Sequence, residues 1–244
     1  MTDANSAVAP TMAPARAAVW EDFIDIFYAP SQVFARRVAG SVWVPLLVVT
    51  VLMSALIYVN SGVLEPMMSA EFDRGMAAAM KNNPRITPEM VGQMRSVGLR
   101  VAQFGGFFTP IGILLTGAAL WLIGKLFDAK QTFSAAILVT AYAFMPRVLE
   151  SVVHGLQGLF LDPAQLDGRF RVSLGVGRFL DPNTVSPILL ALVGRLDVFT
   201  IWVTVLLAIG LSVTGGIPRA RAFMAAPLIW AAGAIPVVFQ AMRG

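Results

Sequence analysis

Five long apolar stretches recur along this chain, and their length constrains the fold more than any other feature. Each holds roughly 17 to 21 mainly apolar residues, near the ~20 that a helix needs to cross ~30 Å of hydrocarbon. They cover residues 43–59, 107–126, 133–152, 197–217 and 221–241. The sequence therefore predicts an integral membrane protein with five transmembrane helices.

The composition favours a helix bundle in a membrane over a soluble domain or a barrel. Hydrophobic residues make up 57% of the chain and charged residues 13%, whereas soluble domains have roughly 45–50% apolar and about 25% charged residues. The apolar stretches are continuous rather than alternating, which favours helices over the strands of a barrel. We therefore expect an all-α fold, a polytopic bundle with additional amphipathic interfacial helices.

The chain divides into three parts by composition. Residues 1–18 are rich in Ala and Pro and are expected to form a disordered tail. Residues 19–38 form an amphipathic interfacial segment, and residues 39–244 form one five-span membrane domain. We expect this domain to have two long outer loops, 61–104 and 155–195.

Both long loops contain local structure signals. Thr87, followed by Pro88 and Glu89, predicts the start of a helix in the first loop, after an earlier helix over about 66–80. In the second loop, the tripeptide Leu-Asp-Pro occurs at 161–163 and again at 180–182. We interpret these tripeptides as turns with a short hairpin between them.

Aromatic residues recur at helical spacing before the first span, while acidic residues such as Asp22 lie on the other side of the same turns. Such a pattern is typical of a helix that lies along a membrane surface. The candidate contacts with the membrane surface or a partner are Trp20, Phe23, Phe27 and Phe34.

Basic residues in the short connections predict the orientation of the chain, because Lys and Arg concentrate in short cytoplasmic loops. They precede the first span and occupy both the link between spans two and three and the link between spans four and five. We therefore expect a cytoplasmic amino terminus and an outer carboxyl terminus. The residues concerned are Arg36, Arg37, Lys125, Lys130, Arg219 and Arg221.

The third span carries the main candidate for a polar site. Arg147, Glu150 and His154 share one helix face by their spacing of three and four residues. Arg147 lies ~21 Å beyond the start of the span, near its outer boundary, and Asp197 opens the fourth span from the same side. We favour a structural ion pair, with Asp197 capping its helix or pairing with Arg147, over a polar relay for transport.

Catalytic, metal and nucleic-acid functions find little support in the sequence. The absence of cysteine excludes thiolate chemistry, and a sole histidine excludes a two-histidine zinc motif, which leaves only an enzyme centred on His154 as a weaker rival. Six methionines between Met67 and Met94 could offer thioethers to copper(I), but no histidine accompanies them. We therefore expect no cofactor and no metal. Basic residues nowhere exceed the pair Arg36-Arg37, so we expect no nucleic acid.

Two motifs and the layout of spans resemble the Yip domain family, five-span membrane proteins whose founding members interact with Rab/Ypt small GTPases. Residues 27–34, FYAPSQVF, resemble the family's aromatic-x-Pro-x-x-x-Phe stretch. Residues 196–202, LDVFTIW, followed by 206–211, LLAIGL, are similar to the pattern of its bacterial branch. The amino-terminal stretch departs from the Asp-Leu-Tyr-Gly-Pro motif of the eukaryotic branch, so the resemblance implies a bacterial-type member without a small GTPase partner.

We therefore interpret the chain as a noncatalytic scaffold that binds partners or organises the membrane. Its expected partners are membrane lipids and other membrane proteins or a second copy of itself. The expected location is the bacterial plasma membrane, that is, the inner membrane. The alternative is a transporter or channel whose polar relay surrounds Arg147, Glu150 and His154.

Overall fold

The fold is all-α, as expected from the sequence. The computed structural model describes residues 18–83, 85–162 and 165–243. In these ranges the regular elements are helices, and one isolated bridge joins Gly175 to Asp197. The tail expected over residues 1–18 lies outside the described residues except at its last position.

Within the described residues, four helical segments are long and apolar enough to cross a membrane, or five if a bent pair counts as one span. The four are Gly105–Leu126, Phe133–Phe160, Val198–Gly215 and Arg219–Met242. The bent pair consists of α3, Trp43–Val59, and α4, Ser61–Asn82, which meet at 78°. The chain is therefore a polytopic membrane protein with four or five candidate spans among its described residues. The four overlap the last four predicted stretches, and the first predicted stretch is α3 of the bent pair.

Short breaks divide several spans into consecutive helices. The second span consists of η1, Gly105–Phe108, and α6, Thr109–Leu126. The third consists of α7, Phe133–Ala143, and α8, Met145–Phe160, and the fourth is α10, Val198–Gly215. The fifth consists of α11, Arg219–Met224, and α12, Ala226–Arg243.

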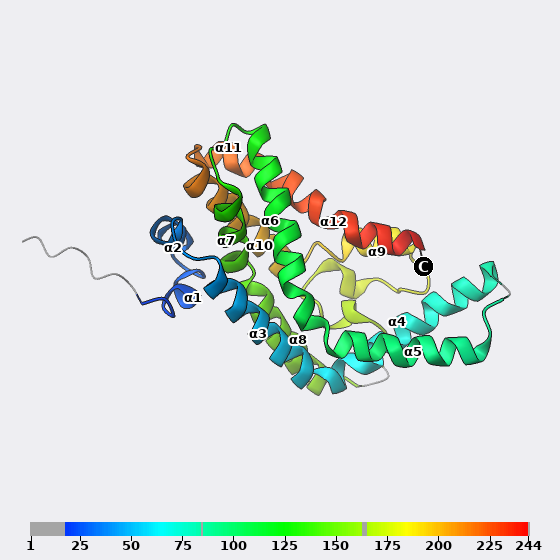
Figure 1. The fold of residues 1–244 in the computed structure, drawn as a ribbon. Coiled ribbons are helices and arrows are strands. Elements are labelled where there is room, and N and C mark those ends of the chain that lie inside the picture. Colours follow the sequence, from blue (N-terminus) through cyan, green and yellow to red (C-terminus); the bar gives the residue numbers. More distant parts are fainter. Residues whose placement is uncertain (1–17, 84, 163–164, 244) are drawn as a thin grey trace, which may run out of the picture.

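Helix α7 lies at the centre of the bundle, where it contacts α3, α6 and α10 (Figure 1). Glycine permits close contact between α7 and two of these helices, α6 and α10. A Cβ atom on Gly117 of α6 would lie 3.0 Å from the side chain of Ile137, and one on Gly210 of α10 would lie 2.2 Å from that of Val139. Close approach of backbones at small residues is the usual basis of helix packing in membranes.

One end of the bundle gathers the amino-terminal segment and the two short links. Here lie α1, Asp22–Asp25, and α2, Pro30–Arg37. Arg219 donates a hydrogen bond to Ser31 at 2.8 Å, and the backbone N–H of Lys130 donates to Gly215 at 2.9 Å. The basic connections therefore share one end of the bundle, whereas the side of the membrane that this end faces stays a prediction.

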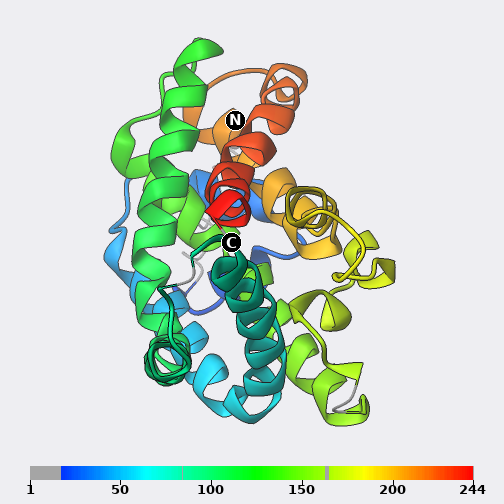
Figure 2. The ribbon, with the colours of Figure 1, turned by 90° about the vertical axis from the view of Figure 1, so that its right-hand side faces the viewer.

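The opposite end carries a helical hairpin that projects sideways from the bundle (Figures 1 and 2). It consists of α4 and of α5, Pro88–Gln103, and it occupies the first expected outer loop, 61–104. The predicted start of α5 is confirmed, because the Thr87 hydroxyl accepts a hydrogen bond from the backbone N–H of Met90 at 3.4 Å. Helix α4 begins earlier than expected, with Pro66 in its interior.

The second expected outer loop, 155–195, differs from its prediction. Its first residues continue α8 to Phe160, and its last residues contain α9, Pro187–Val193. The hairpin predicted between the two Leu-Asp-Pro turns is wrong, because the 3₁₀ helices η3, Arg169–Val172, and η4, Val176–Phe179, occupy that stretch. Turn signals mark where a chain reverses, but they do not distinguish strand pairing from consecutive short helical turns.

Candidate functional site

A buried ion-pair cluster holds the amino-terminal segment against the end of the bundle. The side chain of Asp22 is fully buried, with an exposed fraction of 0%. Its carboxylate accepts hydrogen bonds from the guanidinium groups of Arg36 and Arg37 and from the hydroxyl of Tyr142. Arg36 also pairs with Asp25, so two arginines and two aspartates form one network. We name these residues and Tyr142 the amino-terminal cluster.

Three of the four aromatic residues predicted to contact the membrane surface or a partner pack against this end of the bundle. The rings of Phe23 and Tyr142 lie 5.4 Å apart between centroids, and Phe27 meets Trp202 edge to face at 5.4 Å. Phe34 is fully buried. Only Trp20 keeps a large exposed fraction, 64%, and stays available to lipid or a partner. A helical period identifies an apolar face, but it does not say whether protein or lipid covers that face.

A second polar cluster brings together the four residues predicted from the third and fourth spans, at the start of α10. Arg147 donates to Glu150 at 2.7 Å and, through its other terminal nitrogen, to the hydroxyl of Thr200 at 2.8 Å. The Thr200 hydroxyl donates in turn to Asp197. The cluster is therefore a chain of hydrogen bonds between α8 and α10. We name Arg147, Glu150, His154, Asp197 and Thr200 the outer polar cluster, after the side of the membrane on which the sequence predicts it to lie.

Asp197 is the N-cap of α10. Its Oδ1 accepts hydrogen bonds from the backbone N–H groups of Phe199 at 3.0 Å and Thr200 at 2.9 Å. These donors would otherwise be unsatisfied at the start of a membrane helix. The prediction that Asp197 caps its helix is confirmed, and its link to Arg147 runs through Thr200. Gly175 packs against it so closely that an added Cβ would lie 2.7 Å from the Cβ of Asp197.

His154 lies at the edge of the outer polar cluster without a close partner. Its Nε2 is 3.9 Å from Oε1 of Glu150, which is too long for a hydrogen bond. This nitrogen is buried and has no hydrogen-bond partner among the described residues. The imidazole is therefore positioned beside the Arg147–Glu150 pair without completing its network.

Sequence reasoning missed two partners of this region, Thr200 and Trp230. Arg195 donates to the backbone carbonyl of Trp230 at 3.0 Å, and the indole N–H of Trp230 donates to the carbonyl of Arg195 at 3.3 Å. The guanidinium also lies 5.4 Å from the ring centroid. Burial, together with the nearby positive charge of Arg147, lowers the pKa of Arg195 from its ordinary value. This reciprocal contact joins the segment before α10 to α12.

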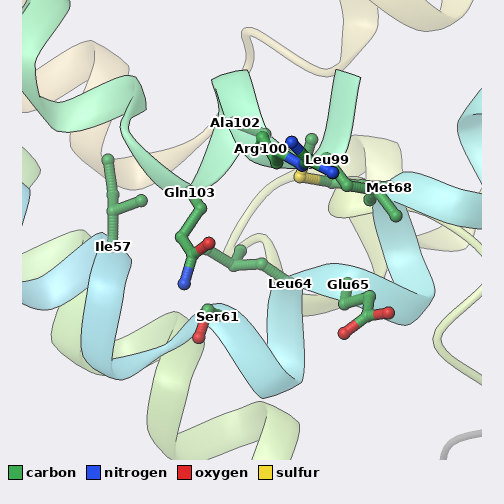
Figure 3. Close-up of a pocket in the computed structure, with 9 residues that line it drawn as sticks. All are labelled: Ile57, Ser61, Leu64, Glu65, Met68, Leu99, Arg100, Ala102 and Gln103. Carbon is green, nitrogen blue, oxygen red and sulfur yellow. The ribbon is translucent and has the colours of Figure 1, made fainter. Parts of the chain in front are cut away.

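A small cavity lies at the corner where the hairpin leaves the bundle (Figure 3). Its volume of about 180 Å³ is below the roughly 300–1,000 Å³ typical of small-ligand sites. The side chain of Gln103 points toward Ser61 across this corner, and Leu64 of α4 and Leu99 of α5 line it as well. The corner therefore serves as a joint between α3, α4 and α5.

Helix α5, together with its C-cap Phe104, exposes a continuous apolar stripe on the side that faces away from α4. Its five members recur every three or four residues, and each has an exposed fraction between 46% and 59%. The opposite face contacts α4 through Arg95, which pairs with Asp73 and lies 5.8 Å from the ring centroid of Phe72. We name this stripe the α5 apolar stripe: Met90, Met94, Val97, Val101 and Phe104.

The chain matches one known family. Compared with models of protein families, residues 24–240 match the model described as the Yip1 domain. The match begins within α1 and ends within α12. No curated protein and no solved structure gave a significant match.

Proposed function

The chain belongs to the Yip1 domain family, and on this premise we propose that it is a noncatalytic scaffold that organises the membrane around it. Its α4–α5 hairpin lies along the membrane boundary and inserts the α5 apolar stripe among lipid chains. In keeping with the motifs at 27–34 and 196–202, we assign it to the bacterial branch and the inner membrane. The cluster of basic links supports a cytoplasmic amino terminus.

The α5 apolar stripe carries this proposal. It runs along the chain into Phe107, Phe108 and Ile111, which are also exposed and belong to the candidate span that contains α6. The exposed apolar side chains of a span face lipid, so the stripe continues a lipid-facing surface. An amphipathic helix gains stability in the interface in proportion to the apolar area that it buries there.

The polar residues of the bundle support a structural role. In the outer polar cluster, Arg147 binds Glu150 and Thr200, and Asp197 is occupied as a helix cap. Groups that satisfy one another within the protein stabilise helix contacts in a medium without water. The scaffold therefore acts through its surfaces, and its partners are membrane lipids, other membrane proteins or a second copy of the chain. We do not assign it a small GTPase partner.

Site-specific labelling tests the insertion of α5, and the absence of cysteine from the chain makes it direct. The variants Val97→Cys, on the stripe, and Ser96→Cys, on the adjacent polar side, are labelled with an environment-sensitive fluorophore and reconstituted in lipid vesicles. Lipids that carry a quencher in their acyl chains should quench the label at 97 strongly and that at 96 weakly. Equal, weak quenching at both positions would place α5 in water and overturn the proposal.

The effect of the inserted hairpin on the membrane is measured by the size of reconstituted vesicles. A hairpin inserted into one leaflet expands that leaflet, so reconstituted vesicles should become smaller as protein is added. The double variant Val97→Asp with Val101→Asp should abolish this change, because charges at these positions oppose insertion. The control Ser96→Asp adds a charge on the polar face and should behave as the unchanged protein. Vesicle diameters that do not differ between the two variants would contradict a membrane-organising role.

A second candidate function, passage of a proton or solute, rests on the position of His154. Its buried Nε2 lies 3.9 Å from Glu150 and has no partner among the described residues, and ionisable groups of this kind line proton pathways in transporters. Reconstituted vesicles should then show a flux that Glu150→Gln abolishes. An unchanged flux in this variant, or none in the unchanged protein, eliminates this candidate.

A further inference from the structure

A larger cavity lies on the other side of the hairpin, between α4, η3, α9 and the last turns of α12. Its volume is about 580 Å³, within the roughly 300–1,000 Å³ typical of sites for small ligands. Helix α9 packs along α12 to form one wall, and α4 forms another. Figure 2 views this end of the molecule, with the carboxyl end of α12 and the hairpin turned toward the reader.

Positive charge predominates in this cavity. Arg74 and Lys81 of α4 and Arg169 of η3 line it, together with one acid, Glu71. Glu71 is already occupied, because it accepts a hydrogen bond from the backbone N–H of Arg169 at 2.8 Å and lies 3.3 Å from its guanidinium. Nearby Asp167 is likewise held by Arg171 at 2.7 Å. Arg171, and less strongly Arg74, lower the pKa of the Asp167 carboxyl. Among the described residues, neither Arg74 nor Lys81 forms an ion pair within 4.0 Å of an acid, so both can reach an anion in the cavity.

The other walls of the cavity are mostly apolar, with Asn183 and Gln240 as their polar members. Leu190 and Ala191 of α9 and Val237 and Ala241 of α12 face it. A ligand that fits must therefore place an anionic group near α4 and apolar atoms near α9 and α12. A cavity with one basic wall and two mainly apolar walls fits an amphiphile better than a small inorganic ion or a sugar.

The location of the cavity identifies the source of such an amphiphile. Helix α12 belongs to the candidate span Arg219–Met242, and Val237 and Ala241 occupy its last turns. These turns lie where the hydrocarbon ends and lipid headgroups begin. Arginine and lysine at this depth recognise phosphate, arginine with paired hydrogen bonds and lysine as a compact charge.

We propose that this cavity binds the phosphate group of an anionic phospholipid, with the first carbons of its acyl chains against α9 and α12. Arg74 and Lys81 hold the phosphate, and Arg169 adds to the positive field. The inference goes beyond the scaffold proposal and does not depend on insertion of α5, because the cavity lies on the side of α4 that α9 and α12 face. A bound lipid at this site would fix the hairpin to the fifth span.

Lipid binding to the full-length protein in mild detergent tests the site. Affinity is measured for an anionic phospholipid, for a zwitterionic phospholipid with the same chains and for inorganic phosphate. We expect the anionic lipid to bind tightest, and Arg74→Gln to weaken it about tenfold, since a charged hydrogen bond is lost. Equal affinity for inorganic phosphate and anionic lipid would make the cavity a site for free phosphate and would overturn the lipid assignment.

Two further variants separate this site from general attraction to anionic lipid. Arg85→Gln removes the same charge from the connection between α4 and α5, outside the cavity, and should leave the affinity unchanged. Ala78→Leu fills part of the cavity without changing charge and should weaken binding as Arg74→Gln does. A similar loss in Arg74→Gln and Arg85→Gln, or full binding by Ala78→Leu, would show that the lipid binds elsewhere.

Discussion

Arg36 donates a hydrogen bond from its Nε to the fully buried carboxylate of Asp22 at 2.6 Å. This contact joins α1 to α2 within the segment before the first span, and the hydroxyl of Tyr142, from α7 at the centre of the bundle, donates to the same carboxylate. The segment before the first span is therefore part of the folded domain. Arg36 and Arg37 bind the carboxylate of Asp22, and they also lie at the end of the bundle where the short basic links gather.

Removing the charge of Asp22 should destabilise the protein strongly. Asp22→Asn leaves two guanidinium groups next to a neutral buried amide, and loss of one partner of a buried pair costs about 3–5 kcal/mol. The control Asp73→Asn breaks the exposed pair with Arg95, which should cost less than about 1 kcal/mol. Thermal unfolding in detergent, followed by tryptophan fluorescence, compares the two variants. Similar unfolding temperatures for both would show that the amino-terminal cluster adds little stability.

Attachment of the amino-terminal segment should depend on pH through Asp25. Hydrogen bonds from Arg36 and Tyr28 hold the pKa of the Asp25 carboxyl below its ordinary value of 3.8. Because the pKa is lowered in the folded state, the stabilisation is complete above pH 3.8 and is lost as the pH falls through the lower folded-state value. Hydrogen exchange of residues 22–37, corrected for its intrinsic pH dependence, should accelerate in that range relative to α10. Asp25→Asn should remove most of this pH dependence. If the pH dependence of exchange were the same in this variant, a group other than Asp25 would be responsible for it.

Replacing the N-cap residue of α10 should lower the free energy of unfolding more than replacing the N-cap residue of α5. Asp197→Ala removes two hydrogen bonds to backbone N–H groups and the acceptor of the Thr200 hydroxyl. The loss should exceed about 2 kcal/mol, because the cap is buried and anchors the outer polar cluster. Thr87→Ala removes one cap bond to the backbone and the hydrogen bond between Thr87 and Glu89, both at an exposed site, and should cost about 0.5–1 kcal/mol. Unfolding in a series of detergent mixtures measures the loss of stability in both variants. If Asp197→Ala lost no more stability than Thr87→Ala, Asp197 would not be the buried cap that anchors the outer polar cluster.

The elements that could be predicted from sequence are those set by neighbouring residues. Apolar length locates the spans, and spacing within one helix places Arg147, Glu150 and His154 together. The partners across helices could not be found this way, since Thr200 lies 53 residues from Arg147 and Tyr142 lies 120 residues from Asp22. Thr200 is also an unremarkable residue in a span, and only the arrangement of α8 and α10 gives its hydroxyl a function.

The contact between α3 and η1 should tolerate glycine alone at position 106. A Cβ on Gly106 would lie 2.3 Å from the Cα of Ser54, and this neighbour is backbone that cannot rotate away. Gly106→Ala should therefore separate the two segments and cost about 1–3 kcal/mol. Gly112→Ala, in α6, is the matched control because an added Cβ there meets nothing within 4 Å, and it should be neutral or stabilising by up to ~1 kcal/mol through helix propensity. Thermal unfolding distinguishes the two, and equal stability of both variants would mean that α3 and η1 pack less closely than described.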